Sequence, residues 1–400
     1  MTRYGCSSVV IVSYRPGDWL ETCIRSVIDQ SDEVILVDNG SPNGLASAVA
    51  APSGVTVVRS RRNLGFAGGV NLGMSKATGS VVALLNDDAS APAGWLAAAT
   101  RVLEDKSIAA VGPKVLLSGW FREVVLPDRV RYAPGDERPL GRQIRSVRVD
   151  GEEVLGRLVG PGLHKLEVQG GDRWRWTAGP LPFYVPVREA DVNVTVDGDP
   201  APPGQLCRVT NSAGIYLRAD GYAGDIGMGS ADDGRWDGGA DRFGVSFTAV
   251  AFRRATWDRL GPLARRYFAY YEDVDWCWRA QLAGLRIRYD PTVAVSHLWS
   301  ATSGGVTGTG VRVLSESNRS LTIVRNAPRP LVMNHLRDRW GEISRRTDGG
   351  VGVRLARRLP WALATRASTQ RRIWSSEPEE VWSAWAGRGA EWSMAPGGMV

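Results

Sequence analysis

The sequence predicts an α/β fold with a mostly parallel sheet flanked by helices, a β/loop insertion and a basic helical C-terminal tail. The first hundred residues alternate short apolar runs with stretches of helical periodicity, which is typical of parallel strands joined by helices. From about residue 119 to 245 the pattern changes to short strand-like pieces broken by Gly, Pro, Asp and Trp. Beyond about residue 330 arginines far outnumber acidic residues.

The expected strands of the first hundred residues are short apolar runs of the kind that is buried on both faces of a sheet. They cover residues 9–12, 34–37, 55–58 and 81–85. A capping-box spacing of Asp18 and Glu21 predicts that the first helix starts just before Leu20. Further helices are expected near 66–77 and 92–104.

Regular structure is expected again after the insertion. Residues 247–254 have an apolar pattern, and a helix is predicted from Glu272 or Asp273 to Gly284, a residue that often ends helices. One or two strands around Pro291 should follow over residues 285–297.

Composition and charge exclude several classes of protein. All but four of the 49 basic residues are arginines and the net charge is +7, which favours anionic ligands or an anionic membrane surface over cationic partners. The four cysteines form no C-x-x-C pair, so neither a zinc ribbon nor a disulfide scaffold is expected, and a reducing cytoplasm fits best. No visible secretion signal and no run of about 18 apolar residues is present.

Polar residues follow each of three predicted strands. Asp38-Asn39-Gly40-Ser41 follows the second strand, 61–69 the third, and Asn86-Asp87-Asp88 the fourth. Because ligands of such sheets bind beyond the carboxyl ends of the strands, these segments are expected to meet at one edge.

Asn86-Asp87-Asp88 is a candidate metal site. Adjacent carboxylates repel each other, and a hard divalent cation such as Mg²⁺ or Mn²⁺ relieves that repulsion. The alternative is an acidic turn that caps the next helix. His297, at the end of a predicted strand, could complete the metal site, although a lone histidine is more often structural.

The stretch 267–279 is rich in aromatic and acidic residues. Glu272, Asp273 and Asp275 would lie at the start of a helix, whose dipole is expected to lower their pKa values and keep them ionised. Such a carboxylate suits a general base, and the aromatic side chains could stack on sugars or belong to the core.

The glycine-rich run 65–69 lets a ligand approach the backbone closely, and Arg61 or Arg62 beside it could contact a diphosphate. Neither the dinucleotide-binding nor the Walker spacing is present, so hydride transfer and P-loop hydrolysis lose support.

Taken in order, the segments VVIVSYRP, ILVDNGSPNG, RNLGFAGGVNLG, LLNDDA, YFAYYEDVDWCWRAQLAG and SHLW resemble the family 2 glycosyltransferases, in particular the rhamnosyltransferase-like branch with a GT-A fold. The resemblance covers roughly residues 9–118 and 246–300, and NSAGIYLRADGYAGDIG, which begins at Asn211, also resembles some members.

This resemblance implies an inverting, Mn²⁺- or Mg²⁺-dependent transfer of a sugar from a nucleotide diphosphate to an acceptor hydroxyl. It assigns the metal to Asp88 and His297, and the base to Asp273 with Glu272 as second choice. Asp38 would contact the nucleotide base. Asp87 would contact either the ribose or a ligand of the metal, without binding the metal itself. The remaining donor-binding residues are Ser13, Tyr14, Arg62, Asn63 and Gly65.

The resemblance also divides the chain. Residues 1–118 would form the nucleotide-sugar-binding half of the GT-A domain and 246–330 the acceptor and catalytic half, separated by the insertion 119–245 and followed by the tail 331–400. The expected donor is dTDP-rhamnose or a UDP-sugar. The expected acceptor is a glycan or a polyprenyl-linked glycan in cell-envelope polysaccharide synthesis.

Two other classes of protein would share parts of this pattern. A sugar nucleotidyltransferase would carry a glycine-rich loop and a lysine after Val12, and both are missing. A degenerate domain that only binds nucleotide, glycan or protein would need no base, whereas Asp88, Asp273 and His297 are present together.

The tail carries tryptophans among its arginines. Trp361, Trp374, Trp382 and Trp385 would suit a helix at a membrane interface, so the hypothesis is a cytoplasmic protein in peripheral contact with the inner membrane face and not with nucleic acid. A solvated basic surface is the alternative.

Overall fold

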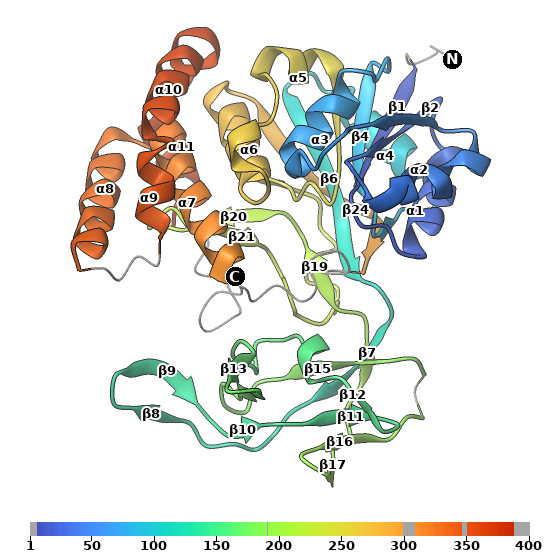
Figure 1. The fold of residues 1–400 in the computed structure, drawn as a ribbon, viewed down its shortest axis with the longest axis vertical. Coiled ribbons are helices and arrows are strands. Elements are labelled where there is room, and N and C mark those ends of the chain that lie inside the picture. The colour runs from blue at the N-terminus through green and yellow to red at the C-terminus, as the bar shows by residue number, and fades with distance from the viewer. Residues whose placement is uncertain (1–5, 190, 299–308, 346–349, 388–400) are drawn as a thin grey trace.

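The computed structural model describes residues 6–189, 191–298, 309–345 and 350–387. Within these residues the largest sheet has ten strands in the order β22-β24-β6-β23-β4-β1-β2-β3, with β19 paired to β6 and β5 paired to β24 (Figure 1). Its strands are β1 Ser7–Ser13, β2 Glu33–Asp38, β3 Thr56–Arg59, β4 Val81–Asn86, β5 Ala89–Ser90, β6 Ile108–Leu117, β19 Thr210–Ser212, β22 Ala240–Arg242, β23 Ala249–Arg253 and β24 Arg286–His297.

The sheet is largely parallel, which confirms the predicted fold class. β4, β1, β2 and β3 pair in parallel, β23 lies antiparallel between β4 and β6, and β24 is again parallel to β6. The four apolar runs predicted as strands are β1 to β4. The register of β24 on β6 shifts between Asp290 and Ala294, around Pro291, because proline cannot donate to the ladder.

Helices cover both faces of the sheet. α1, α2 and α4 bury their apolar sides in one core cluster, and α3, α5 and α6 do so in another on the opposite face. Their bounds are α1 Trp19–Ile28, α2 Leu45–Ala50, α3 Gly65–Met74, α4 Trp95–Val102, α5 Arg254–Leu260 and α6 Glu272–Leu282.

The predicted capping box of α1 is wrong, although the helix starts where expected. Asp18 makes no side-chain cap hydrogen bond, and Glu21 accepts from Arg25 one turn later, at 2.5 Å, instead of reaching back. The helix is held by its apolar face, on which Leu20, Ile24 and Val27 are buried.

The insertion forms several small sheets with a core of its own, drawn at the bottom of Figure 1. Val124, Ile144, Val147, Phe183 and Val185 lie in that core. The strands of this part are β7 Trp120–Val124, β8 Arg131–Ala133, β9 Asp136–Leu140, β10 Gln143–Ile144, β11 Val147–Val149, β12 Glu152–Glu153, β13 Glu167–Gln169, β14 Asp172–Trp176, β15 Phe183–Val187, β16 Val194–Val196, β17 Asp199–Pro200 and β18 Leu206–Cys207. The chain then returns to the main sheet through β19 and forms the hairpin β20 Ile215–Leu217 and β21 Ala223–Asp225.

Five C-terminal helices pack beside α6, at the left of Figure 1. They are α7 Thr309–Asn326, α8 Arg329–Ser344, α9 Val351–Ala356, α10 Leu359–Ile373 and α11 Pro378–Trp385. Residues 346–349 and 388–400 of the predicted tail, and Trp299 of the SHLW motif, lie outside the described residues.

The tail tryptophans, which the sequence suggested for a membrane interface, pack in part against the protein's own core. All four are partly buried against the core cluster shared by α6 and the C-terminal helices. Trp382 stacks on Trp278 with ring centroids 5.9 Å apart, and Trp361 meets the edge of Tyr267 at 6.1 Å. In the described part of the chain, no helix combines the length and the apolar character that crossing a membrane requires.

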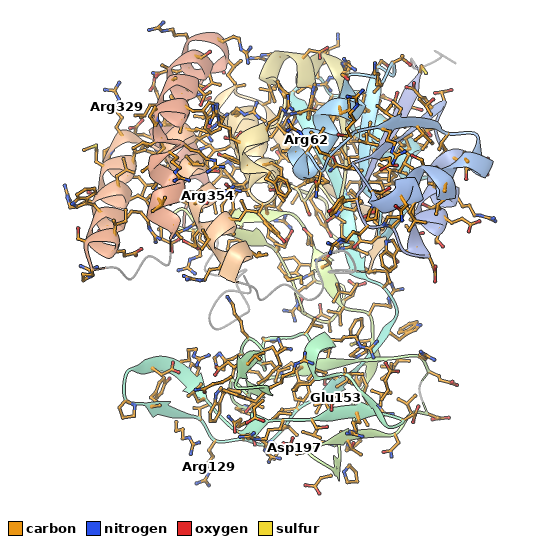
Figure 2. The ribbon with its side chains drawn as sticks, viewed as in Figure 1. Arg62, Arg129, Glu153, Asp197, Arg329 and Arg354 are labelled. Atoms are coloured by element: carbon orange, nitrogen blue, oxygen red, sulfur yellow. The ribbon has the colours of Figure 1, made fainter. Side chains whose placement is uncertain are left out.

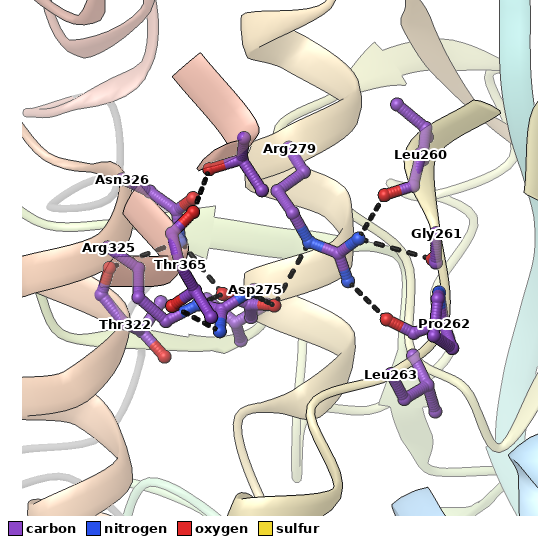
Figure 3. A network of polar contacts seen from close by, with 12 residues as sticks. Leu260, Gly261, Pro262, Leu263, Asp275, Arg279, Thr322, Arg325, Asn326 and Thr365 are labelled. Carbon is purple, nitrogen blue, oxygen red and sulfur yellow. Dashed lines mark hydrogen bonds and ion pairs between the residues drawn. The ribbon is translucent and has the colours of Figure 1, made fainter. Parts of the chain in front are cut away.

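A buried polar network fixes these helices to α6 (Figure 3). The Asp275 carboxylate accepts hydrogen bonds from Arg279 at 3.1 Å, Arg325 at 2.8 Å and Asn326 at 2.9 Å. Arg279 also donates to the carbonyls of residues 260–262 at the end of α5. Burial alone would raise the pKa of Asp275, but the two arginines outweigh it and lower that pKa. Asp275 is therefore a structural anion that holds the helix carrying Glu272 and Asp273.

Candidate functional site

The carboxyl ends of β1, β2 and β4 meet at one edge of the sheet, as predicted. Ser13 pairs with Asp38 in the register of β1 and β2, and the Ser13 hydroxyl donates to Asp87 Oδ2 at 2.6 Å. Burial raises the pKa of Asp87 to about 7, and repulsion from Asp88 adds to this while the Ser13 hydrogen bond and His297 oppose it. An ionised Asp87 therefore gains from any cation at this edge.

Asp88 and His297 lie against each other, although they are far apart in the sequence. Asp88 belongs to the turn between β4 and β5, and pairing of β5 with β24 sets His297 opposite Ala89. The amide of Leu298 donates to the Asp88 carbonyl at 2.9 Å. As a result His297 Nε2 lies 3.1 Å from Asp88 Oδ1.

Asn211, on β19, orients the imidazole from behind. Its Oδ1 lies 2.6 Å from His297 Nδ1, and its amide nitrogen donates to the sulfur of Met228 at 3.1 Å. Because the Asn211 oxygen can only accept, this arrangement assigns a ring proton to Nδ1 and turns Nε2 toward Asp88. Nε2 and the carboxylate oxygen then face each other, and either a proton on Nε2 or a shared cation satisfies both.

Within the described ranges no group of three or more His, Cys, Asp or Glu side chains is arranged to hold a metal ion. The donor set is thus one carboxylate and one imidazole. It fits a cation that takes its other ligands from water and phosphate, as Mg²⁺ and Mn²⁺ commonly do.

Asp38 is fully buried and holds the loop that follows β2. Its carboxylate accepts from the Ser41 amide at 2.8 Å and the Ser47 hydroxyl at 2.5 Å, and Arg59 lies 3.6 Å away. Burial raises the pKa of Asp38, but these hydrogen bonds outweigh burial, so the pKa lies below its usual value. Contact with a nucleotide base stays a prediction for this residue.

The glycine-rich loop is braced by two asparagines. Asn39 accepts from the amide of Leu64 at 3.0 Å and donates to the side chain of Asn63 at 3.2 Å and to the carbonyl of Gly65 at 3.1 Å. Gly65 has φ +74°, and a Cβ there would lie 2.3 Å from the carbonyl oxygen of Phe268. Only glycine fits where the loop before α6 crosses this one.

Arg62 and Tyr14 lie at the outer side of this edge. Arg62 is exposed beside α3 (Figure 2) and, with Asn63 and Leu64, lines a cavity of about 550 Å³. Tyr14 is half-buried, with the Arg15 guanidinium 5.4 Å from its ring centre. Among the described residues no hydrogen bond joins the Tyr14 side chain to the Asp88–His297 pair.

The two base candidates begin α6 but differ in exposure. Glu272 is buried, and its Oε2 has no hydrogen-bond partner among the described residues, whereas Asp273 is only partly buried. The Asp273 carboxylate accepts from the amide of Val274 at 2.7 Å. Its position at the helix start matches the prediction, and its greater exposure favours it over Glu272 for contact with a substrate.

The prediction that the helix dipole lowers the pKa values of these two carboxyls is wrong. Burial raises the pKa of Glu272 well above its usual value, and the neighbouring charge of Asp273 adds to that. Burial also raises the pKa of Asp273, against hydrogen bonds from the amides of Val274, Asp273 itself and Phe247. Desolvation thus outweighs the dipole, and it makes Asp273 a stronger base than an exposed aspartate.

Asp225, at the end of β21, is an acidic residue to which sequence reasoning assigned no role. Its Oδ1 is enclosed without a hydrogen-bond partner among the described residues. Burial raises the pKa of Asp225 to about 7, and the negative charge of Asp273 raises this pKa further. A hydrogen bond from Ser212 and the charge of His297 act in the opposite direction and lower it. The charges of Asp273 and His297 therefore act on the Asp225 carboxyl.

Comparison with known proteins supports the resemblance over part of the chain. Residues 8–144 match the family model described as Glycosyl transferase family 2. No curated protein matches the sequence.

The solved structures that match the chain include the following three. GalNAc-T7 with UDP, GalNAc and Mn²⁺ has 14% identity and a TM-score of 0.47, covering 81% of this chain and 48% of that one. The mannosyltransferase PcManGT from Pyrobaculum calidifontis with GDP-Man and Mn²⁺ has 16% identity and a TM-score of 0.43, covering 98% and 81%. Glucosyl-3-phosphoglycerate synthase from Mycobacterium tuberculosis with Mn²⁺, UDP and glucosyl-3-phosphoglycerate has 20% identity and a TM-score of 0.25, covering 28% and 44%.

This chain thus spans less than half the length of the first and third of these proteins. All three TM-scores are below 0.5, so the likeness assigns neither residues nor substrates. Over residues 8–144, which hold β1 to β4 and the turn with Asp87 and Asp88, the chain matches the family 2 glycosyltransferases.

Proposed function

We propose that this protein is an inverting, metal-dependent glycosyltransferase that moves a hexose from a nucleotide diphosphate to a hydroxyl of a glycan or a polyprenyl-linked glycan. The observation that carries the proposal is the Asp88–His297 pair, held at 3.1 Å with Asn211 behind it. Asp88 lies just after β4, inside the segment that matches the family 2 glycosyltransferases.

Asp88 Oδ1 and His297 Nε2 would hold Mn²⁺ or Mg²⁺. When bound, the cation would offset the charge that develops on the diphosphate leaving group. Asp87, tied to Ser13, adds negative charge behind this pair. Asp87 would also contact the ribose.

Asp273 would act as the general base. It would take the proton from the acceptor hydroxyl while that oxygen attacks the anomeric carbon, and the nucleotide diphosphate would leave from the opposite face with inversion. One carboxylate is enough for this single displacement, unlike the pair that a glycosidase uses. Glu272, more deeply buried, is the second choice.

The donor would lie along the edge formed by Ser13, Tyr14 and Asp38 and by the braced loop at Asn63 and Gly65. Because the Asp38 carboxylate is engaged by Ser41, Ser47 and Arg59, its main effect would be to hold the loop in shape for the nucleotide. dTDP-rhamnose is the favoured donor and UDP-hexoses follow, with a role in cell-envelope polysaccharide synthesis.

We also propose peripheral membrane contact through the C-terminal helices, on residues other than those expected from the sequence. Met333 and Trp340 are exposed by 62% and 71% on α8, and Val353 and Leu363 by 58% and 49% on α9 and α10. Exposed Arg329 and Arg337 lie on α8 with the first two. Apolar side chains among arginines suit an anionic lipid surface.

The transferase proposal is tested by turnover of a donor panel, read by mass spectrometry. dTDP-rhamnose, UDP-glucose, UDP-galactose and GDP-mannose are each incubated with Mn²⁺ and a farnesyl-diphosphate-linked sugar. We expect one donor to give a glycosylated product, with a loss of at least 100-fold in Asp273→Asn and a smaller loss in Glu272→Gln. Nucleotide binding without turnover of any donor would favour the degenerate, binding-only domain.

A further inference from the structure

A second charged region adjoins the site on the side of the C-terminal helices. It is a cavity of about 470 Å³. Its lining residues are Arg265, Arg266, Phe268, Gly310, Val313, Leu314, Arg354 and Arg358. The 550 Å³ cavity at Arg62–Leu64 shares Arg265 and Arg266 with it, so five arginines line two adjoining spaces. Figure 2 shows Arg62 beside α3 and Arg354 on α9.

Among the described residues these arginines have no carboxylate partner, whereas the buried Arg279, Arg319 and Arg325 have one. No acidic residue lines either cavity, and within the described ranges no ion pair joins any of the five to a carboxylate. The Nε atoms of Arg354 and Arg358 are buried without a hydrogen-bond partner in the described part of the chain. A guanidinium donor left buried and unpaired is costly, so it marks a place where an anion would bind.

Mutual repulsion within the cluster leads to the same conclusion. Burial lowers the pKa of Arg358, and the positive charges of Arg266 and Arg357 lower it further. Burial and the charge of Arg358 likewise lower the pKa of Arg354. An anion with several acceptor oxygens, such as a phosphate or a diphosphate, would satisfy these donors together.

One wall of the cavity is apolar and is held in place under strain. Phe268 has φ +70° and is exposed by 41%, and Val313 and Leu314 of α7 line the same space. Asn318 of α7 fixes this loop by donating to the carbonyls of Tyr267, Ala269 and Tyr270 at 2.8 to 3.0 Å. Such strain persists only where the surroundings impose it, and it is common in ligand sites.

We propose that this cavity binds the phosphate or diphosphate of a lipid-linked acceptor, with the arginines on the anionic group and Phe268, Val313 and Leu314 against the first part of the hydrocarbon chain. The inference rests on the proposed transferase function, whose acceptor it specifies. Neither Asp88 nor His297 lines either cavity, so the donor diphosphate would occupy a different place. The shared loop 62–64 would bring the acceptor head group next to the donor.

The test measures binding of three probes to the full chain by calorimetry: inorganic pyrophosphate, farnesyl diphosphate and farnesol. We expect farnesyl diphosphate to bind more tightly than pyrophosphate, and farnesol the least. The double variant R354Q/R358Q should bind farnesyl diphosphate at least tenfold more weakly than the native chain. R129Q, at an exposed arginine of the insertion that lines neither cavity, should stay within twofold.

Two further experiments distinguish the donor diphosphate from the acceptor phosphate and provide a second variant in case the first does not fold. Saturating Mn²⁺ with the tightest-binding nucleotide should leave farnesyl diphosphate affinity unchanged, whereas full competition would assign the site to the donor and overturn the proposal. If R354Q/R358Q does not fold, R265Q/R266Q, on an exposed turn, must give the tenfold loss.

Equal affinity in native and variant chains would also overturn the proposal. Nucleotide binding by the native chain is read separately, so failure of the transferase proposal is distinguishable from failure of this one.

Discussion

At the residue scale, Asp88 and His297 were candidates for a metal site because one follows a predicted strand and the other ends one, and strand ends meet at one edge of such a sheet. Sequence reasoning did not find Asn211 or Asp225, although both lie in a segment that resembles family members. Neither follows a long apolar run, and their roles depend on how β19 and β21 return to the main sheet after the insertion. No local pattern encodes that return.

Asp225 gives a pH dependence of stability with a definite sign. Its folded pKa, raised to about 7, lies above the usual value of about 4, so the folded state binds more protons than the unfolded state between these limits. Stability should therefore fall as pH rises from about 4 to about 7. Asp225→Asn removes this loss and should be more stable than the native chain at pH 8, by on the order of 1 to 3 kcal/mol, with little difference at pH 4.

Urea unfolding of both chains at pH 4, 6 and 8, with a chelator present, checks this. A constant difference in the free energy of unfolding across the three pH values would contradict the assigned role of Asp225.

At the element scale, the loops around the site depend on two contacts that the sequence only partly revealed. The sequence indicated that a ligand comes close to the backbone of the glycine-rich run. In the structure the close neighbour of Gly65 is the loop before α6, which is distant in the sequence. The three early carboxylates of α6 were expected to behave alike. Their pKa values differ instead: burial raises those of Glu272 and Asp273, whereas Arg325 and Arg279 lower that of Asp275.

Substitution of Gly65 tests the loop crossing. Gly65→Ala adds a Cβ that would lie 2.3 Å from the Phe268 carbonyl oxygen, in a left-handed conformation. We expect a loss of about 2 to 4 kcal/mol in the free energy of unfolding and weaker nucleotide binding. Gly54→Ala is the matched control, since Gly54 has φ +69° and no atom near its Cβ position, and it should cost about 1 kcal/mol. Equal losses in urea unfolding would show that the Phe268 contact is unimportant.

Removal of Asp275 tests the anchor between α6 and the C-terminal helices. Asp275→Ala leaves Arg279 and Arg325 buried without their carboxylate, which should cost about 3 to 5 kcal/mol. Asp258→Ala breaks the more exposed pair with Arg254 and should cost about 0.5 kcal/mol or less. Thermal unfolding of the two variants checks this, and similar midpoints would contradict the anchoring role.

At the scale of the whole molecule, alternation of apolar runs predicted the sheet and the helices that cover it. The place of the tail was not predictable in the same way. A helix rich in tryptophan and arginine can cover either a membrane or another helix, and periodicity does not distinguish the two. The partner of Trp361 and Trp382 proved to be α6 and the turn before it.

Sedimentation with lipid vesicles tests the proposed membrane contact through Met333 and Trp340 of α8. The native chain should sediment with vesicles that contain anionic lipid and should do so less with neutral ones. Met333→Ser with Trp340→Ser should reduce this binding at least fivefold, whereas Trp120→Ser, an exposed tryptophan of the insertion, should not. Equal sedimentation of the native chain and the double variant would contradict contact through α8.

In the proposed function, donor binding depends on a cation held by Asp88 and His297. Calorimetric titration with dTDP, UDP and GDP, with and without Mn²⁺, on the native chain and on Asp88→Ala, tests this dependence. We expect one nucleotide to bind only with Mn²⁺, and Asp88→Ala to lose at least tenfold in affinity. Nucleotide binding that is indifferent to Mn²⁺ or unchanged in Asp88→Ala would show that the two residues do not hold such a cation.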